Sequence, residues 1–405
     1  VRLDMSLPFS FVTIDAGVSY TSIKNQGRSK HTPTTHTYHL GSRRDDFDSQ
    51  EKTKAAFLSF HHEWDIYAIK MGLRYEHIGE NKDVDVAIAT VGTPSSNRIT
   101  NIDPSYNLST RDYWLPSFNF SFKPKDGHQV SLTWGTGTIR PNFYDLNPLR
   151  IFKTGFEYFE GDPKLEASRT SNIELSYQNH RGLFVSGYHH HTSNKVEQST
   201  EVGYVYATPD QLYVCLFPEN LDRADKTGFY LRYQHQLTPN LLATVEGETC
   251  YQDFENAYPN PFVAPYKFHG WGENLGISAD LYLYRRHTLL LNSRYQHWFS
   301  DYTGTTKTDG YGYFYFALRY SMLDDRLRLS LVANDPFHQH VTDETMNNVY
   351  SRINNYKTQY QFSHTNHHAH YVGLTATYSL GSKKVRRVHH DTKDTERQRA
   401  EKLSK

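Results

Sequence analysis

The sequence predicts an all-β protein, specifically an antiparallel transmembrane β-barrel with about fourteen visible strands. Segments that alternate apolar and polar residues recur along the whole chain, as strands with two different faces do. The connections between these segments alternate between short turns and long polar loops. Outer-membrane barrels show this asymmetry, because their turns are short at one membrane face and longer at the other. The pattern therefore predicts both a barrel and its orientation.

The predicted strands share one pattern, with an apolar residue at every second position and polar residues between. From 67 to 75 every odd position is apolar or aromatic, whereas Lys70, Arg74 and Glu76 occupy even positions. Such segments occur at 14–21, 56–60, 67–76, 117–122, 129–134, 173–178, 183–192, 229–234, 244–251, 277–283, 289–296, 314–319, 327–331 and 372–380. Soluble sandwiches also alternate, but their strands usually have about five or six residues. The long, charged second face favours a barrel with a wet lumen.

Two kinds of connection separate these strands. Short turns are predicted at Trp64-Asp65, Lys123–His128, Asn179–Gly182, Thr238–Asn240, Arg285–His287 and Met322–Arg326. Long polar loops are predicted at 24–50, 79–112, 137–168, 192–226, 253–266, 299–310 and 336–366.

Composition agrees with a barrel and excludes several other classes. Hydrophobic residues make up 37% of the 405 residues, and the mean hydropathy is −0.72. No stretch approaches the roughly 18 continuous apolar residues of a spanning helix. Aromatic residues make up 15%; this excess suits rings at a membrane interface, although any β-rich protein favours Tyr and Phe. The 44 basic and 44 acidic residues balance, so no nucleic-acid partner is expected.

The chain ends and the cysteines give three further expectations. The chain begins without Met or a signal peptide, so we expect a mature chain or one that lacks its N-terminal part. Residues 382–405 are highly charged and lack apolar periodicity, which predicts a solvated tail. Two cysteines, Cys215 and Cys250, are too few for a disulfide scaffold. They form either one external bridge or two free thiols.

The stretch 115–177 carries a resemblance to a known family. Its characteristic pieces are Arg140-Pro141, Leu146-Asn147-Pro148, Gly161-Asp162-Pro163-Lys164-Leu165 and Asn172-Ile173-Glu174-Leu175. With these pieces the chain resembles the C-terminal barrel of TonB-dependent outer-membrane receptors, in the Bacteroidetes-type outer membrane protein beta-barrel family. Members typically have Gly-Asn-Pro-x-Leu followed by Pro-Glu. This chain departs from that pattern at Asp162 and at Glu166-Ala167-Ser168.

The resemblance implies a plugged barrel of about 22 strands, of which this chain would supply the C-terminal part. Residues 1–381 are then a partial barrel without a plug domain, and residues 382–405 a charged periplasmic tail. The implied location is the outer membrane of a Gram-negative cell. The implied function is nutrient uptake, with ligand capture by the extracellular loops and energy from TonB. Expected partners are outer-membrane lipid, an unknown small or oligomeric nutrient, and the TonB system, whose docking part is absent from this chain.

The loop 137–168 is the main candidate for ligand contacts. Pro141, Pro148 and Pro163 each remove a backbone donor, so regular pairing must stop near residue 140. The candidate ligand-binding residues are Arg140, Asn142, Tyr144, Phe152, Phe156 and Tyr158. The alternative, which we favour for the aromatic rings, is that they pack the loop on itself.

Histidine is abundant, but no metal site and no cofactor are expected. Neighbouring side chains on a strand point to opposite faces, so only alternate histidines can chelate together. The weak candidates are His189 with His191 and His368 with His370. No diagnostic catalytic motif occurs, so an enzyme is not expected. The alternatives to uptake are a self-contained passive channel, a surface anchor or adhesin, and an inactive transporter remnant.

Overall fold

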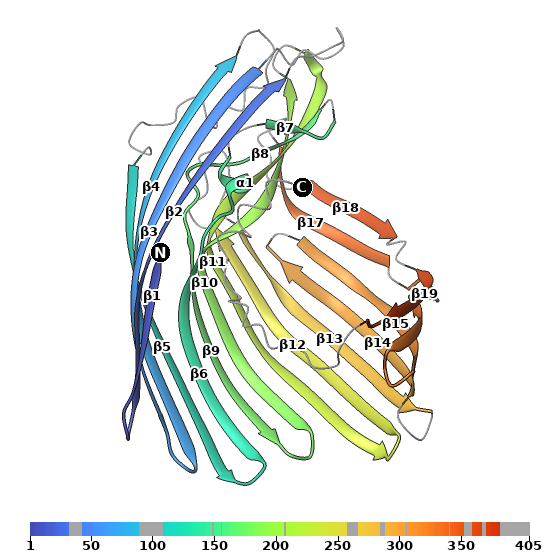
Figure 1. Cartoon of the computed structure of the whole chain (residues 1–405). Helices are drawn as coiled ribbons and strands as arrows, with labels where there is room; N and C mark the ends of the chain where they lie inside the picture. The colour runs from blue at the N-terminus through green and yellow to red at the C-terminus, as the bar shows by residue number, and fades with distance from the viewer. Residues whose placement is uncertain are drawn as a thin grey trace.

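In a computed structural model, the described residues form one sheet of 19 strands and one short helix (Figure 1). The structure describes residues 1–31, 43–88, 108–147, 150–154, 156–205, 208–256, 266–283, 288–304, 306–339, 341–351, 359–366 and 370–380. The predicted tail 382–405 and the predicted turn Arg285–His287 lie outside these residues. In the described part of the chain, no helix is long and apolar enough to cross a membrane.

Fifteen of the strands form a continuous wall in which each pairs antiparallel with its neighbour. They are β1 (Arg2–Pro8), β2 (Thr13–His31), β3 (Arg43–Glu63), β4 (Tyr67–Ile88), β5 (Leu108–Lys125), β6 (His128–Ile139), β9 (Ser168–Asn179), β10 (Leu183–Val205), β11 (Thr208–Thr238), β12 (Leu241–Asn256), β13 (Tyr266–Tyr282), β14 (Leu289–Thr303), β15 (Thr306–Met322), β16 (Leu327–Asn334) and β19 (Tyr371–Tyr378). The wall curves around a central hollow (Figure 1).

All fourteen predicted strands are present in this wall. The fifteenth, β1, was not predicted; it joins β2 through a turn in which the amide of Phe9 donates to the carbonyl of Val12 over 2.8 Å. The predicted short turns within the described residues lie at one end of the wall, which we call the turn end, and the long connections lie at the other, the loop end (Figure 1). The predicted asymmetry is not complete, because at the loop end β14 and β15 pair as far as Thr303↔Thr306, within the predicted loop 299–310, and β10 and β11 as far as Val205↔Thr208.

The predicted loops are too long at several places. The loop 192–226 is largely strand, because β10 and β11 continue pairing from Leu183↔Tyr233 to Tyr204↔Leu212. Likewise, β2 extends to His31 and β4 to Ile88. The β2 extension is polar on both faces, so hydrophobic periodicity could not indicate it. The end of β4 does alternate, with Val84, Val86 and Ile88 at every second position, and the β11 stretch 212–217 is continuously apolar; both were wrongly included in predicted loops.

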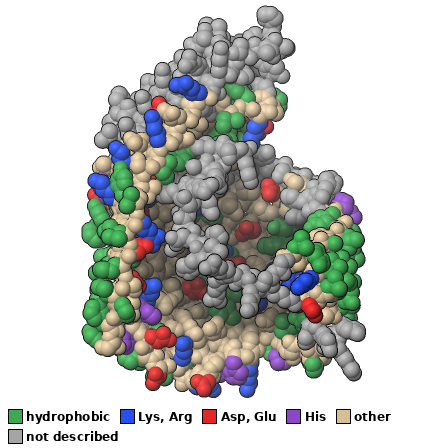
Figure 2. All heavy atoms as spheres, in the orientation of Figure 1, with side chains coloured by type: hydrophobic (Ala, Val, Ile, Leu, Met, Phe, Trp, Pro, Cys, Tyr) green, Lys and Arg blue, Asp and Glu red, His purple; other side chains and the backbone are tan. Residues whose placement is uncertain are grey.

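The two faces of the wall differ in chemistry. On β3 and β4 the paired residues Leu58 and Leu73 are 43% and 45% exposed on the outer face. Figure 2 shows apolar side chains along the outer sides and acidic side chains inside the hollow. Apolar exposure on this scale matches a wall that faces lipid outside and water inside.

The remaining elements lie at the loop end. The connection between β6 and β9 holds α1 (Phe143–Leu146), β7 (Arg150–Phe152) and β8 (Glu157–Glu160). The connection between β16 and β19 holds β17 (Val341–Ser351) and β18 (Gln359–Asn366). β17 pairs antiparallel with β15 at Thr306–Thr308 and parallel with β10 at Thr200–Val202. It therefore crosses the loop end between two wall strands that are far apart in sequence.

The apolar outer face gives a direct test of the membrane assignment. Replacing Leu73 by Arg should lower the free energy of unfolding of the intact protein in lipid vesicles by about 2–4 kcal/mol, because a charge is placed in hydrocarbon. Denaturant titration of the vesicle-inserted protein measures this loss. The matched control Leu73→Phe keeps the site apolar, and equal stability of the two variants would contradict a lipid-facing position.

Candidate functional site on the inner face of the wall

The β6–β9 connection begins at Arg140, whose guanidinium holds it to the wall. Its Nη1 donates to Glu51 of β3 over 2.7 Å, and its Nη2 donates to Glu76 of β4 over 3.4 Å. The Arg140 side chain is 10% exposed, and the two carboxylates are 4% and 8% exposed. Arg74 also donates to Glu76, over 2.7 Å. Two buried carboxylates from neighbouring strands therefore hold the first residue of the β6–β9 connection against the wall.

Asn142, the next predicted site residue, caps α1. Its Oδ1 accepts from the amide of Asp145 over 2.8 Å, which satisfies a donor that the first helical turn leaves unpaired. The turn places Phe143 and Leu146 together with Leu165 in a buried cluster against Ile23 of β2 and Val196 of β10. A segment rich in proline thus acquires its own small core between two distant strands.

The predicted aromatic residues of this connection lie in different environments. Tyr158 is fully buried with Tyr213, Cys215 and Phe217 of β11, and Phe152 packs against that cluster. The ring of Tyr144 is half-buried and stacks on Phe159, with 4.3 Å between centroids. Phe156 is 53% exposed. Of the predicted rings, Phe156 is therefore the most accessible to a ligand, whereas Tyr158 packs the connection onto β11.

A buried ion pair accompanies the Tyr158 cluster. The Nε of Arg150 donates to Glu160 over 2.7 Å, and the guanidinium lies 4.8 Å from the centre of the Tyr158 ring. Burial disfavours the charged guanidinium, but the Glu160 carboxylate outweighs this effect, and the pKa of Arg150 is raised. Arg150 thus stays charged inside the connection.

The connection ends in a second set of polar contacts. Arg111 of β5 donates to Glu166 over 2.7 Å, and the backbone amide of Glu166 donates to Asn220 over 2.8 Å. Asn220 in turn donates to the carbonyls of Glu166 and Asn194. Both ends of the connection are therefore tied to the wall.

The cysteines and histidines are placed as follows. Cys215 and Cys250 are both buried and do not form a disulfide, so the alternative with two thiols holds. His189 contacts the Thr227 hydroxyl and His191 the Asp225 carboxylate. His370 lies beside His338, and His368 falls outside the described residues. Among the described residues, no group of three or more His, Cys, Asp or Glu side chains could hold a metal ion.

A polar network that was not predicted from the sequence lies on the inner face of β10–β13. Glu248 of β12 accepts from Lys226 over 2.7 Å, from Asn274 over 3.2 Å and from the hydroxyl of Tyr188. All four side chains stand at polar positions of the alternation. Alternation alone identifies that face, but the contacts depend on the register between strands, which the sequence does not provide.

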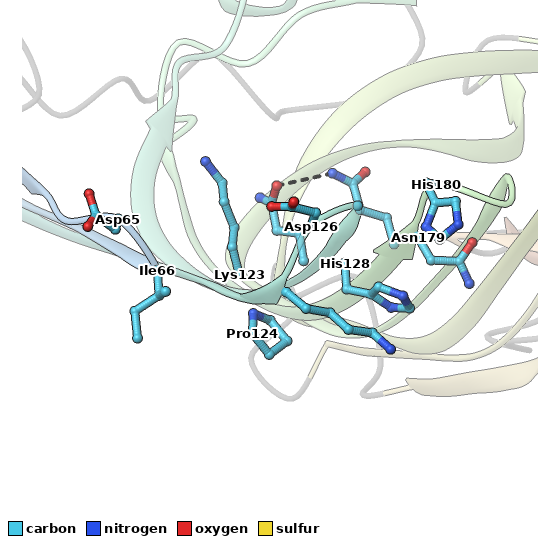
Figure 3. A pocket seen from close by; sticks show the side chains of 12 residues that line it. Asp65, Ile66, Lys123, Pro124, Asp126, His128, Asn179 and His180 are labelled. Atoms are coloured by element: carbon cyan, nitrogen blue, oxygen red, sulfur yellow. Dashed lines mark hydrogen bonds between the residues drawn. The ribbon is translucent and has the colours of Figure 1, made fainter.

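A shallow pocket of about 690 Å³ lies at the turn end (Figure 3). It is formed by three neighbouring turns, and the backbone amide of His180 donates to the carbonyl of Gly127 over 2.6 Å. Its lining includes Lys123 and Lys125 as well as Asp65 and Asp126. Because both signs are present, this pocket offers no selective site for an ion.

The role of the Arg140 ion pairs can be tested by removing the guanidinium. Arg140→Ala should lower the free energy of unfolding by about 3–5 kcal/mol, because it removes the guanidinium from the buried Glu51 carboxylate and leaves Glu76 paired with Arg74. Denaturant unfolding of the intact protein measures the loss.

The triple variant Arg140→Met, Glu51→Gln, Glu76→Gln is the matched control, because it removes all three charges together. It should recover most of the stability. A loss as large as that of Arg140→Ala would show that the charges themselves are not responsible.

Comparisons with known proteins agree with this architecture. The model of a family described as the outer membrane protein beta-barrel family matches residues 1–378. A comparison with curated proteins found no match.

Solved structures share the fold at low sequence identity. The copper transporter OprC superposes with a TM-score of 0.56 at 14% identity, covering 86% of this chain and 51% of its own. The ferric yersiniabactin uptake receptor FyuA from Yersinia pestis gives 0.57 at 14% identity, with 84% and 49% covered. The iron transporter FrpB from Neisseria meningitidis gives 0.51 at 11%, with 84% and 51% covered. The chain thus spans about half the length of these three proteins.

Proposed function

The chain belongs to the outer membrane protein beta-barrel family, and on that premise we propose that it forms part of the wall of a TonB-dependent, receptor-like transporter. Its location is the outer membrane. The transporter takes up a nutrient that is too large or too scarce for a simple porin, and it is not an enzyme. The observation that supports this most is the long β6–β9 connection, which is folded against the inner wall at the loop end.

The edges of the wall support a larger barrel. Within the described residues, β1 pairs only with β2, and β19 pairs only with β16. Because fifteen strands alternate in direction, the two edge strands run the same way and cannot close on each other antiparallel. Closure of an even-numbered barrel then requires an odd number of further strands. The same parity argues against a self-contained barrel of fourteen strands.

In this proposal the loop end faces the cell exterior and the turn end faces the periplasm, as in other outer-membrane barrels. The segments 79–112, 137–168, 192–226 and 336–366 supply the ligand contacts. The charged tail 382–405 lies in the periplasm. The plug and the TonB-docking part are expected outside the wall that this chain forms.

Dependence of uptake on TonB distinguishes the proposed transporter from a passive channel. A strain that lacks the protein should need at least about tenfold more of one limiting nutrient for growth, and the defect should disappear when that nutrient is in excess. The probes are ferric siderophores, Cu²⁺ and neutral oligosaccharides, each supplied as the limiting source. Deleting TonB should reproduce the defect; undiminished uptake without TonB would support the passive channel.

Substitutions at two rings of the β6–β9 connection distinguish a ring that binds ligand from a ring that packs the connection onto the wall. Phe156→Ala should weaken ligand binding about fivefold, because an exposed ring at an interface is lost, with little effect on stability. Tyr158→Ala should instead lower the free energy of unfolding by about 3–5 kcal/mol, because it opens a cavity in a buried cluster. Ligand titration and denaturant unfolding of the intact protein measure both effects. Normal ligand binding by Phe156→Ala would show that this ring does not contact the ligand.

A further inference from the structure

Three aromatic rings stack on the inner face of β14 and β15. Trp298 lies 4.8 Å from Tyr311 and 5.8 Å from Tyr313 between ring centres, with interplanar angles of 15° and 20°. All three side chains are half-buried. We call this group the inner aromatic stack. Near-parallel rings that keep part of their surface open are unusual on a face that otherwise carries polar side chains.

The strand register places the stack on the inner face. Trp298 is paired with Asn274 of β13, and Asn274 is paired with Glu248 of β12, which belongs to the inner polar network. The next residue along β14, Phe299, is 50% exposed on the outer face. The register between β13 and β14 is regular through the Asn274–Trp298 pair, so Trp298 lies on the same face as Gln296, two residues earlier. The register shifts only beyond this pair, between Asn274 and Glu273.

A row of hydrogen-bonding side chains adjoins the stack. Gln296, two residues before Trp298, donates to the Oδ1 of Asn274 over 3.4 Å. Arg294 donates to Gln296 over 3.0 Å and to Glu246 over 2.8 Å. Together with the Asn274–Glu248 contact, this row offers amide and carboxylate groups at the edge of the rings.

The charges in this row are already paired. Arg294 pairs with Glu246, and Lys226 pairs with Glu248 over 2.7 Å. Asp301, which interacts electrostatically with Tyr311 and accepts from Gln252 over 2.7 Å, adds one carboxylate, so the surface does not attract an anionic ligand. A fitting ligand is uncharged, has many hydroxyl groups and has a flat apolar face.

From these features we infer that the inner aromatic stack binds a neutral oligosaccharide. The C–H face of a pyranose ring packs on an aromatic face, while its hydroxyls exchange hydrogen bonds with amides and carboxylates. Aromatic surface with a few convergent polar groups is the usual composition of a small-molecule site. This inference rests on the proposed function and names the class of its substrate.

A charged metal chelate fits this surface less well. The paired carboxylates give no excess positive charge for an anionic chelate, and among the described residues no group of three or more metal-binding side chains exists. A free apolar peptide would leave the amide and carboxylate groups without partners, which is costly in a desolvated complex.

The test is binding of neutral hexasaccharides to the intact protein purified from outer membranes. A panel of maltohexaose, cellohexaose, mannohexaose and xylohexaose is titrated by calorimetry, with ferric enterobactin as the charged comparison. At least one hexasaccharide should bind. Trp298→Ala should weaken its binding at least about tenfold, and Trp298→Phe should stay within about threefold because a ring remains.

Phe299→Ala is the matched control, because it removes a ring from the same strand on the opposite face. It should bind the hexasaccharide as the unmodified protein does. If Trp298→Ala does not fold, which its electrophoretic mobility before and after heating reveals, Tyr311→Leu takes its place with the same expected loss. Absence of binding across the panel, or equal losses for Trp298→Ala and Phe299→Ala, would overturn the inference.

Binding and uptake measurements distinguish a failure of the oligosaccharide site from a failure of the transporter proposal. Energised uptake of a ferric siderophore or Cu²⁺ without hexasaccharide binding would overturn the oligosaccharide site and leave the transporter in place. Hexasaccharide binding that depends on Trp298, without TonB-dependent uptake, would support the site and overturn the transporter.

Discussion

The structure depends on the pairing of backbone amides in a wall that lies within lipid. Hydrocarbon offers no partner to an N–H or C=O group, so each strand must be paired on both sides or lie at an edge that something else covers. This requirement produces the continuous antiparallel register from β1 to β19. It also leaves the side chains free to differ between the two faces, so that one sheet can present lipid-compatible residues outside and charged residues inside.

On the inner face, charged side chains contact side chains of opposite charge from other elements. Arg140 between Glu51 and Glu76, Arg150 beside Glu160 and Lys226 beside Glu248 each place opposite charges from different elements in contact. Such pairs add little net stability compared with apolar packing, but they penalise any arrangement that separates them. In this molecule they fix where the β6–β9 connection lies. That connection consequently has a defined shape although it is rich in proline and polar residues.

The wall was predictable because lipid imposes a period of two on its strands, and all fourteen predicted segments are strands. β1 was missed although Leu3, Met5 and Leu7 alternate with polar residues. The strands β7, β8 and β17 carry no such period, and β18 alternates only at Tyr360 and Phe362. Arg140 and Asn142 were recognised as special from the Arg-Pro motif, but their partners Glu51 and Asp145 depend on distances that no motif specifies. The inner aromatic stack had a visible signal, since Tyr311 and Tyr313 continue the face of Tyr315 just before the predicted strand 314–319, and Trp298 continues the face of Gln296 just after the predicted strand 289–296. The contact between the rings depends on the register that pairs Trp298 with Tyr311, which periodicity does not specify.

The strand β17 has a consequence for the rates at which a ligand could exchange. It joins β15 at Thr306–Thr308, three residues toward the loop end from Tyr311, and continues to β10. A molecule that enters along this side of the loop end passes close to this backbone bridge. In the proposed transporter the bridge slows arrival and departure alike, which lengthens residence without strengthening affinity. Under that proposal the cargo must be held until energy arrives, and a long residence time serves this better than a tighter equilibrium.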